Sequence, residues 1–342
     1  MQNAGGIDMA KHDLGIDLGT ATFVVYKRGE GIIIQEPSMV AINKRKGQIL
    51  AIGAAAKEMI GKTPEEISIV KPIQDGVISD PDVIEEVLRY FIKKAKETFA
   101  ISKPNLVIGI PALTTDVERR AVVDAAERVG AARADLVIEP LAAAIGSGID
   151  IVKPDGNMII DMGGGTTDIV VISLGGIVVS DSIKLAGQAM DAEIIKYVKR
   201  VYRFLIGEST AEQIKIKIGK AYEKEENIEL EIKGQDLKTG LPSSIKLNSE
   251  DVFKAIKEIL DELISHIRMV LEKTPPELAS DILKNGIILT GGTALTRGID
   301  KFIEEKTCVK TRITDEPHLT VAKGTGILLD DIELLSRVSV DY

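Results

Sequence analysis

Two segments that lie far apart in the chain share one arrangement of residue types. Residues 15–22 read GIDLGTAT and residues 160–168 read IDMGGGTTD. In each segment an apolar run ends at an aspartate, a glycine-rich turn with threonine follows, and a second apolar run begins. Glycine lets backbone N–H groups approach anionic oxygens, and successive N–H groups form an anion-binding concavity. With a carboxylate beside each turn, the pattern predicts two half-sites for a phosphate chain and a divalent cation.

Other glycine turns strengthen this interpretation. A lone turn of this kind more often serves hairpin geometry than binding, but further turns follow apolar runs at Gly187 and at Gly291–Gly292. Neither the P-loop pattern nor the dinucleotide-binding GxGxxG pattern is present. Asp17 and Asp161 could instead accept hydrogen bonds from their own turns. Their matched positions favour Mg²⁺, held directly or through water by carboxylates that are ionised at pH 7.

Three more charged residues are candidates for chemistry. Glu139 follows a predicted strand at 137–138 and precedes Pro140. It either is solvated or caps a helix, or it orients an attacking water opposite a terminal phosphate, and the sequence leaves both roles open. Glu212 and Lys215 share one face of a predicted helix. They form either an exposed ion pair or a contact with a nucleoside.

The elements that must position these residues alternate between strands and helices. Apolar runs at 14–17, 23–26, 32–34 and 106–110 predict strands. The predicted helices are those that begin at the caps Asp80 and Thr115-x-x-Glu118, one over 189–206, one capped by Ser209, and one from a Ser249 cap to about Lys273. This alternation predicts an α/β fold with mixed sheets, and a break near residue 150 separates two halves.

Composition narrows the class of protein. The chain of 342 residues carries a formal net charge of −9, which argues against broad attraction to nucleic acid. The single Cys308 excludes an internal disulfide, and we expect it to be a buried, unreactive thiol. The N-terminus lacks the pattern of a secretory signal. The most apolar long window, residues 136–152, is too interrupted to predict a membrane span.

Taken together, these motifs resemble those of the actin, heat-shock-70 and sugar-kinase ATPase superfamily. Within it, the chain is similar to the MreB/Mbl family of bacterial actin-like cell-shape proteins over about residues 13–330. The segments GESTAEQIK (207–215) and TPPEL (274–278) are more specific than the glycine turns. The resemblance implies an α/β, actin-like ATPase fold with two duplicated ribonuclease-H-like lobes around a nucleotide cleft.

The resemblance also implies where the lobes begin and end. The first lobe would comprise residues 1–150, with a small inserted subdomain at about 36–74. The second would comprise residues 151–342, with a small inserted subdomain at about 188–248. The C-terminal segment, about 318–342, is expected to pack back on the first lobe.

By the same resemblance, each candidate residue receives a role in binding ATP and Mg²⁺. Glu139, with Thr166 or Thr167, would place the hydrolytic water, and Asp17 and Asp161 would organise Mg²⁺. The implied contacts with ATP are Thr20, Ala21 and Thr22 in the first turn, Gly163, Gly164 and Gly165 in the second, Glu212 and Lys215 beside the nucleoside, and Gly291, Gly292, Thr293 and Ala294 on the adenosine side.

Three positions depart from the family pattern. Thr22 stands where the family usually has Asn, Ile138 where it often has a second Glu, and Thr293 where a third Gly is common. Thr293 adds a Cβ near the nucleotide, and we expect it to loosen or reshape the adenosine pocket. None of the three departures removes a group assigned to the metal or the water.

The function implied by the resemblance is a slow ATPase coupled to polymerisation. Paired protofilaments of this chain would lie in the cytoplasm on the inner face of the cell membrane and guide membrane-embedded cell-wall elongation proteins, with no nucleic-acid partner. Phe99 and Ile101 lie where an apolar membrane loop is expected, next to several lysines. A helix end tucked into the core is the alternative for these two residues. A heat-shock-70-like chaperone and a sugar kinase are the rival functions. The kinase would place an Asp base where this chain has Glu139.

Overall fold

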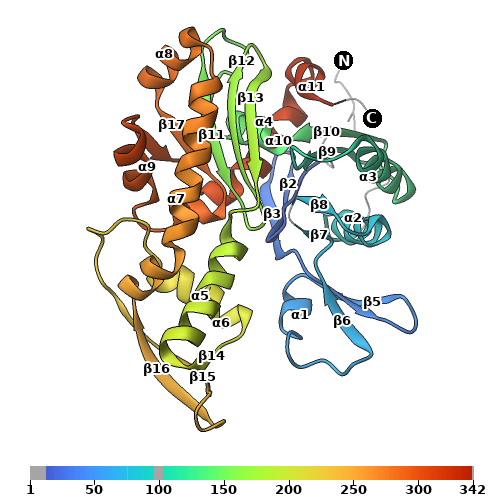
Figure 1. The fold of residues 1–342 in the computed structure, drawn as a ribbon. Helices are drawn as coiled ribbons and strands as arrows, with labels where there is room; N and C mark the ends of the chain where they lie inside the picture. Colours follow the sequence, from blue (N-terminus) through green and yellow to red (C-terminus); the bar gives the residue numbers. More distant parts are fainter. Residues whose placement is uncertain (1–12, 75, 96–102, 341–342) are drawn as a thin grey trace, which may run out of the picture. The chain divides into compact units, whose positions relative to one another are not determined.

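The chain forms two compact units. The structure, a computed structural model, describes residues 13–74, 76–95 and 103–340 (Figure 1). Unit 1 comprises Met1–Asp150 and Leu319–Tyr342, and unit 2 comprises Ile151–His318. Phe99 and Ile101, the predicted membrane contacts, lie outside the described residues.

Each unit is built on a five-stranded sheet, and the two sheets have the same connectivity. The strand orders are β10-β9-β1-β2-β3 in unit 1 and β13-β12-β11-β17-β18 in unit 2. The central strands β1 and β11 each pair antiparallel with the next strand in sequence and parallel with a later one. This repeated topology confirms the predicted duplication of an α/β fold.

Most strands of the two large sheets follow the predicted apolar runs, but those at 176–183 and 311–313 match no predicted run. In unit 1 they are β1 (Leu14–Leu18), β2 (Thr22–Lys27), β3 (Gly31–Pro37), β9 (Asn105–Ile110) and β10 (Arg133–Ile138). In unit 2 they are β11 (Asn157–Met162), β12 (Thr167–Ser173), β13 (Gly176–Ile183), β17 (Ile287–Thr290) and β18 (Thr311–Ile313).

Helices cover both faces of the sheet in unit 1. Helices α2 (Pro81–Ala95) and α3 (Asp116–Arg128) pack with Ile16 and Leu18 of β1 in one hydrophobic core. Because side chains alternate along a strand, Gly15 and Asp17 belong to the opposite face. There a Cβ on Gly15 would meet Thr325 of α10 (Thr320–Asp330).

Helix α10 returns to unit 1 from the C-terminal part of the chain and packs closely on α4 (Glu139–Gly146). A Cβ on Gly324 of α10 would overlap the carbonyl oxygen of Ala142, and a Cβ on Gly146 would overlap that of Thr320. Glycine at both positions therefore allows the two backbones to touch. The last helix, α11 (Ile332–Val338), follows directly.

In unit 2, two long helices cover one face of the sheet. Helices α5 (Gly187–Tyr202) and α7 (Ser249–Lys273) share a core with Met158, Ile160 and Met162 of β11. Alternation places Asp161 on the other face, and its antiparallel partner Asp168 lies there with it. Shorter helices α8 (Pro276–Asn285) and α9 (Ile299–Thr307) follow α7.

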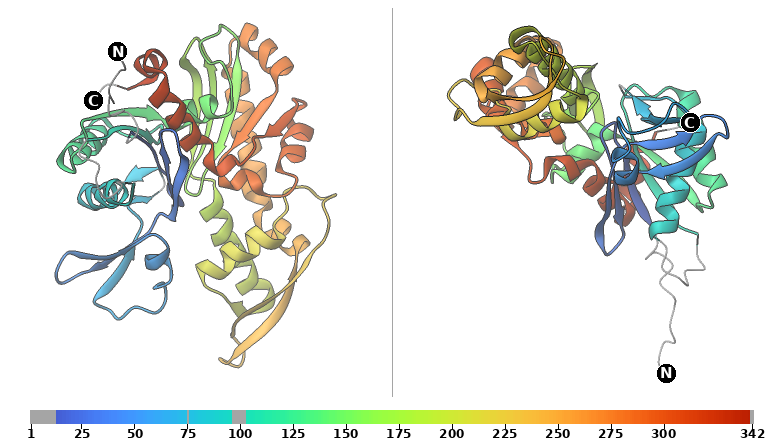
Figure 2. Two further views of the ribbon diagram at one scale, coloured as in Figure 1. Left: turned by 180° about the vertical axis from the view of Figure 1, so that it is seen from behind. Right: turned by 90° about the horizontal axis from the view of Figure 1, so that it is seen from below.

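Smaller elements extend each unit (Figures 1 and 2). In unit 1 they are the sheet β5-β4-β6, the helix α1 (Ala54–Lys57) and the hairpin β7 (Ile73–Gln74) and β8 (Val77–Ile78), with β4 at Val40–Asn43, β5 at Gln48–Ile52 and β6 at Ile67–Val70. In unit 2 they are α6 (Glu208–Ile218) and the sheet of β14 (Phe204–Leu205), β15 (Glu229–Asp236) and β16 (Pro242–Asn248).

The predicted helix starts in unit 1 are confirmed. Thr115 and Glu118 form a capping box at α3, and the Asp80 carboxylate accepts hydrogen bonds from Asp82 N and Val83 N at α2.

Three predicted helix boundaries in unit 2 are wrong, namely one C-terminus and two N-terminal caps. Helix α5 ends at Tyr202, four residues early, because Arg203 adopts a left-handed conformation with φ 53° and begins the turn into β14. Helix α6 starts at Glu208, after Gly207, without a side-chain cap from Ser209. The cap of α7 is Asn248, in a box with Asp251.

Two further features concern the exposure of Cys308 and the search for membrane-spanning helices. The prediction that Cys308 is buried is wrong: it is an exposed thiol at the left-handed C-cap of α9, with φ 59°. Within residues 13–74, 76–95 and 103–340, no helix is long and apolar enough to cross a membrane.

Candidate functional site

The β11–β12 turn of unit 2 is held so that its backbone N–H groups face one way. Gly187 N donates to Gly163 O at 3.3 Å, and Gln188 N donates to Gly164 O at 2.8 Å. In a planar trans peptide the C=O and the following N–H point in opposite directions. The N–H groups of Gly164 and Gly165 therefore point away from the start of α5. Two successive N–H groups with this orientation suit an anionic oxygen.

Two buried carboxylates lie beside this turn. Asp161, at the end of β11, is directly opposite Asp168 on β12, and Thr290 Oγ1 donates to Asp161 Oδ1 at 3.0 Å. Thr166 Oγ1 donates to Asp168 Oδ2 at 3.4 Å. Oδ1 of Asp168 has no hydrogen-bond partner within the described part of the chain.

Burial changes the charge of this pair. Loss of hydration, then repulsion from Asp168, raises the pKa of Asp161 to about 7, against a smaller lowering by Thr290. Burial also raises the pKa of Asp168. The prediction that Asp161 is ionised at pH 7 therefore holds only in part for the chain without a cation, because Asp161 is buried and has lost its hydration. A bound cation would favour the ionised form of both groups.

The two candidate threonines of this turn differ in how their hydroxyls are used. Thr167 is fully buried, and its Oγ1 donates to Leu185 O at 2.6 Å. Thr166 lies next to the turn and donates only weakly, at 3.4 Å, to Asp168. Thr166 is thus the better placed of the two to contact a ligand beside the turn.

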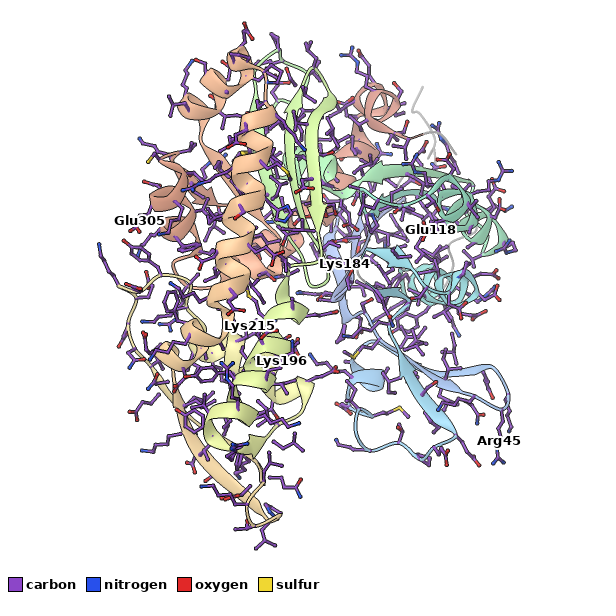
Figure 3. All side chains as sticks on the ribbon, in the orientation of Figure 1. Arg45, Glu118, Lys184, Lys196, Lys215 and Glu305 are labelled. Carbon is purple, nitrogen blue, oxygen red and sulfur yellow. The ribbon has the colours of Figure 1, made fainter. Side chains whose placement is uncertain are left out.

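The nucleoside candidates of unit 2 lie close to the same turn. Lys215 Nζ, on α6, donates to Gly187 O at 2.8 Å and to Asp191 Oδ2 at 2.9 Å (Figure 3). Its acidic partner in the structure is therefore Asp191 on α5, one turn into that helix. Glu212, one turn earlier on α6, is half-buried.

The loop after β17 reaches the β11–β12 turn as well. Gly291 has φ 81°, and a Cβ there would overlap the carbonyl oxygen of Met162, so only glycine suits this position. The 3-10 helix η2 (Gly292–Leu295) follows, with Thr293 and Ala294 buried. Thr293 Oγ1 donates to Gly163 O at 2.6 Å. The side chain of Thr293 thus ties this loop to the β11–β12 turn, while its predicted effect on the adenosine pocket stays a prediction.

Unit 1 carries the corresponding half-site at the ends of its strands. Asp17 is the second-last residue of β1. In the turn that follows, a Cβ on Gly19 would lie 2.7 Å from Thr22 O and 3.4 Å from Asp17 Oδ1. Asp17 pairs with Gly109 of β9, and Glu139 Cγ lies 3.6 Å from the place of a Cβ on Gly109. Asp17 and the buried Glu139 thus flank one glycine. Thr20 is buried, Ala21 is exposed and Thr22 opens β2.

The structure adds four residues that the sequence did not single out. Asp168 and Thr290 flank Asp161, Asp191 pairs with Lys215, and Gly109 makes room beside Glu139. Asp168 has a signal in the sequence, because it closes the repeated motif and strand pairing sets it opposite Asp161. The other three come from distant segments and carry no local signal.

The residues of unit 2 fit a phosphate chain with a hard cation. The turn offers oriented N–H groups, and Asp161 and Asp168 offer carboxylate oxygens, the ligands that Mg²⁺ prefers. Within the described residues, no group of three or more His, Cys, Asp or Glu forms a metal site by itself. Mg²⁺ commonly keeps several waters and shares its ligands with substrate phosphates.

Comparisons with known proteins agree on one family. The family model described as MreB/Mbl protein matches residues 11–337. The cell shape-determining protein Mbl of Bacillus cereus is 46% identical over 329 residues, which cover 96% of this chain and 99% of that protein. The cell shape-determining protein MreB of Escherichia coli is 42% identical over 331 residues, covering 95% of each.

Solved structures of similar fold include two actin-like proteins. MreB5 of Spiroplasma citri bound to ADP superposes with a TM-score of 0.89 at 37% identity, covering 93% of this chain and 96% of that one. The MamK double helical filament has a TM-score of 0.78 at 23% identity, covering 93% of this chain and 98% of that one. The second likeness concerns the fold alone.

The raised pKa of Asp161 predicts how stability depends on pH. Because the folded chain binds the Asp161 proton more tightly than the unfolded chain, stability falls as pH rises from 3.8 to about 7, and the full penalty remains above that.

Asp161→Asn removes a penalty on the order of a few kcal/mol. In metal- and nucleotide-free buffer, its Tm should exceed that of the unmodified chain by several degrees at pH 8 and by much less at pH 5. Asp155→Asn, on an exposed turn, is the control. Its Tm should differ from that of the unmodified chain by the same amount at pH 5 and at pH 8. An equal Tm difference at both pH values for Asp161→Asn would contradict the argument.

Proposed function

This chain belongs to the MreB/Mbl family, and from that premise we propose how its two half-sites work. Members of this family are actin-like, filament-forming ATPases that determine cell shape, and that is the function of this chain. The family match over residues 11–337 favours this function over the chaperone and the sugar kinase. The observation that carries the proposed mechanism is the β11–β12 turn, with oriented N–H groups beside two buried carboxylates.

We propose that both half-sites bind parts of one ATP molecule. Gly163–Gly165 and Thr20–Thr22 would donate to the phosphates. Lys215 and Glu212 would lie beside the nucleoside, and Gly291–Ala294 would close on the adenosine side. MreB5 of Spiroplasma citri, whose structures are described as bound to ADP and to AMPPNP, supports an adenine nucleotide.

Asp17 and Asp161 would hold Mg²⁺, directly or through water, and Asp168, which is paired with Asp161 across the hairpin, would accept hydrogen bonds from those waters. The ion would neutralise charge on the phosphate oxygens during transfer. Glu139 would accept a hydrogen bond from the attacking water and orient it, with Thr166 as the second contact. Orientation is the main task of Glu139, because the reaction depends more on positioning than on a strong base.

We further propose that hydrolysis is slow in the monomer and faster in the filament. Membership of a filament-forming family supports self-assembly of this chain. The proposed place of these filaments is the cytoplasmic face of the membrane, with membrane-embedded wall-elongation proteins as partners. Phe99 and Ile101 would contact the lipid. Each monomer would contribute little affinity, and the filament would bind through many weak contacts.

Coupling to assembly predicts a concentration-dependent ATPase. Phosphate release per subunit should rise where light scattering with Mg-ATP first reports polymers, because assembly completes the active geometry. The measurement is phosphate release and scattering on the same dilution series. A flat specific activity across the scattering threshold would refute the coupling.

Glu139→Ala should separate binding from hydrolysis. Loss of a group that orients water should lower the single-turnover hydrolysis rate by about 100-fold, while the Kd for ATP stays within about threefold. Glu118→Ala is the matched control, because Glu118 also lies at a helix start in unit 1 but serves the capping box of α3. It should lower Tm without a comparable loss of hydrolysis. Equal losses of binding and hydrolysis in Glu139→Ala would mean that Glu139 is structural.

Membrane contact through residues 99 and 101 has its own test. The double change Phe99→Ser with Ile101→Ser should reduce co-pelleting of filaments with anionic vesicles to the level of neutral vesicles. Leu113→Ser with Val117→Ser provides the control, since those side chains are 59% and 80% exposed in the same unit. Unchanged pelleting by the first pair would exclude this loop as the anchor.

A further inference from the structure

One carbonyl group in unit 2 joins segments from three parts of the chain. Gly163 O accepts a hydrogen bond from Thr293 Oγ1 at 2.6 Å and another from Gly187 N at 3.3 Å. Thr293 belongs to η2, Gly187 begins α5, and Gly163 opens the phosphate turn. The short distance and the 6% exposure of Thr293 mark a hydrogen bond screened from water.

The same threonine oxygen lies against the start of α5. A Cβ on Gly187 would lie 2.9 Å from Thr293 Oγ1 and 2.9 Å from Lys215 Nζ. Lys215 Nζ in turn donates to Gly187 O at 2.8 Å. We call these four residues, Gly163, Gly187, Lys215 and Thr293, the Gly163 junction. The junction links the phosphate turn to both segments proposed to contact the nucleoside, α6 and η2.

The orientation of the phosphate turn depends on this junction. With Gly163 O held by two donors, the peptide plane between Gly163 and Gly164 cannot rotate without breaking both bonds. That plane carries the Gly164 N–H group, which faces the opposite side. Thr293 therefore acts on a phosphate-binding group without touching the phosphate.

The other hydrogen bonds around η2 stay within the loop, so it is the Thr293 side chain that connects this loop to Gly163 O. Ala294 N donates to Gly291 O at 3.2 Å, and both the amide and the hydroxyl of Thr296 donate to Thr293 O, at 3.0 and 2.9 Å. These bonds close the loop on itself. The bond to Gly163 needs a hydroxyl on the β-carbon of residue 293, which Thr and Ser have and Gly, Ala and Val lack.

We propose that Thr293 is a positioning residue that locks the adenosine-side loop onto the phosphate turn and thereby slows the release of bound nucleotide. The inference rests on the proposed binding of ATP at this site. With both segments held in the binding geometry before ATP arrives, less conformational freedom is lost on binding. The nucleotide is then released either after the Gly163 junction opens or directly from a site that stays in its binding geometry.

The test compares side chains at position 293 by nucleotide release. Thr293→Val keeps the shape and removes the hydroxyl, and Thr293→Ser keeps the hydroxyl. Stopped-flow release of a ribose-labelled fluorescent ATP analogue, with Mg²⁺ and below the polymerisation threshold, gives the rate. Thr293→Val should release the analogue about fivefold faster, the factor that corresponds to one hydrogen bond of about 1 kcal/mol. Thr293→Ser should stay within about twofold of the unmodified chain.

A buried threonine in the same loop provides the control. Thr296→Val removes the hydroxyl bond to Thr293 O but leaves the link to Gly163 intact. It should lower Tm and leave the release rate within about twofold. If Thr293→Val does not fold, Thr293→Ala replaces it, and faster release that Thr293→Ser does not show supports the proposal equally.

The outcomes separate this inference from the proposed function. If the unmodified chain binds the analogue and the Val and Ala variants at position 293 release it at the unmodified rate, the positioning role is wrong and ATP binding stands. The role is also wrong if Thr296→Val speeds release as much as Thr293→Val, because the effect would then be general loosening. If the unmodified chain binds no ATP analogue, the proposed function fails and this inference fails with it.

Discussion

The half-site in unit 2 depends on the groups that donate hydrogen bonds to the carbonyl oxygens of the β11–β12 turn. A turn that binds an anion must present N–H groups, and each N–H shares a rigid plane with a carbonyl that faces the other way. A buried carbonyl without a partner is costly, so the turn needs donors behind it. Gly187 N, Gln188 N and Thr293 Oγ1 are those donors. The first turn of α5 therefore serves the phosphate turn by supporting it from behind.

The two units share a topology but differ in the chemistry that it positions. Asp161 faces Asp168 across its hairpin, whereas the matching Asp17 faces Val24. On the parallel side, Thr290 adjoins Asp161 and Gly109 adjoins Asp17. Burial, and then repulsion from this second carboxylate, raises the pKa of Asp161. The glycine in unit 1 makes room for Glu139. Duplication thus supplies one geometry, and the residues that adjoin the matching aspartates differ between the two units.

Glu139 is held by close packing of two helices that are far apart in the sequence. It begins α4, whose Ala142 and Gly146 lie against α10 at backbone contact distance. Interiors packed to this density transmit small displacements, so a shift of α10 would move the helix that carries Glu139. The returning C-terminal segment is therefore part of the scaffold that holds Glu139 in unit 1.

The sequence alone determined the repeated Asp–Gly–Thr turns, the duplicated α/β fold and most strands, because these depend on local periodicity and on residue types within a few positions. The family followed from the resemblance of longer segments, such as residues 207–215 and 274–278, to known proteins. The sequence did not predict the end of α5, because the left-handed residue there is Arg203 and not glycine, the usual signal for a helix end. It did not predict the raised pKa of Asp161 or the hydrogen bond from Thr293 to Gly163 O. Those two properties depend on burial and on partners up to 130 residues away. Only the tertiary structure brings such groups within hydrogen-bonding distance, and only burial there makes their charge and their bonds differ from those of the free side chains.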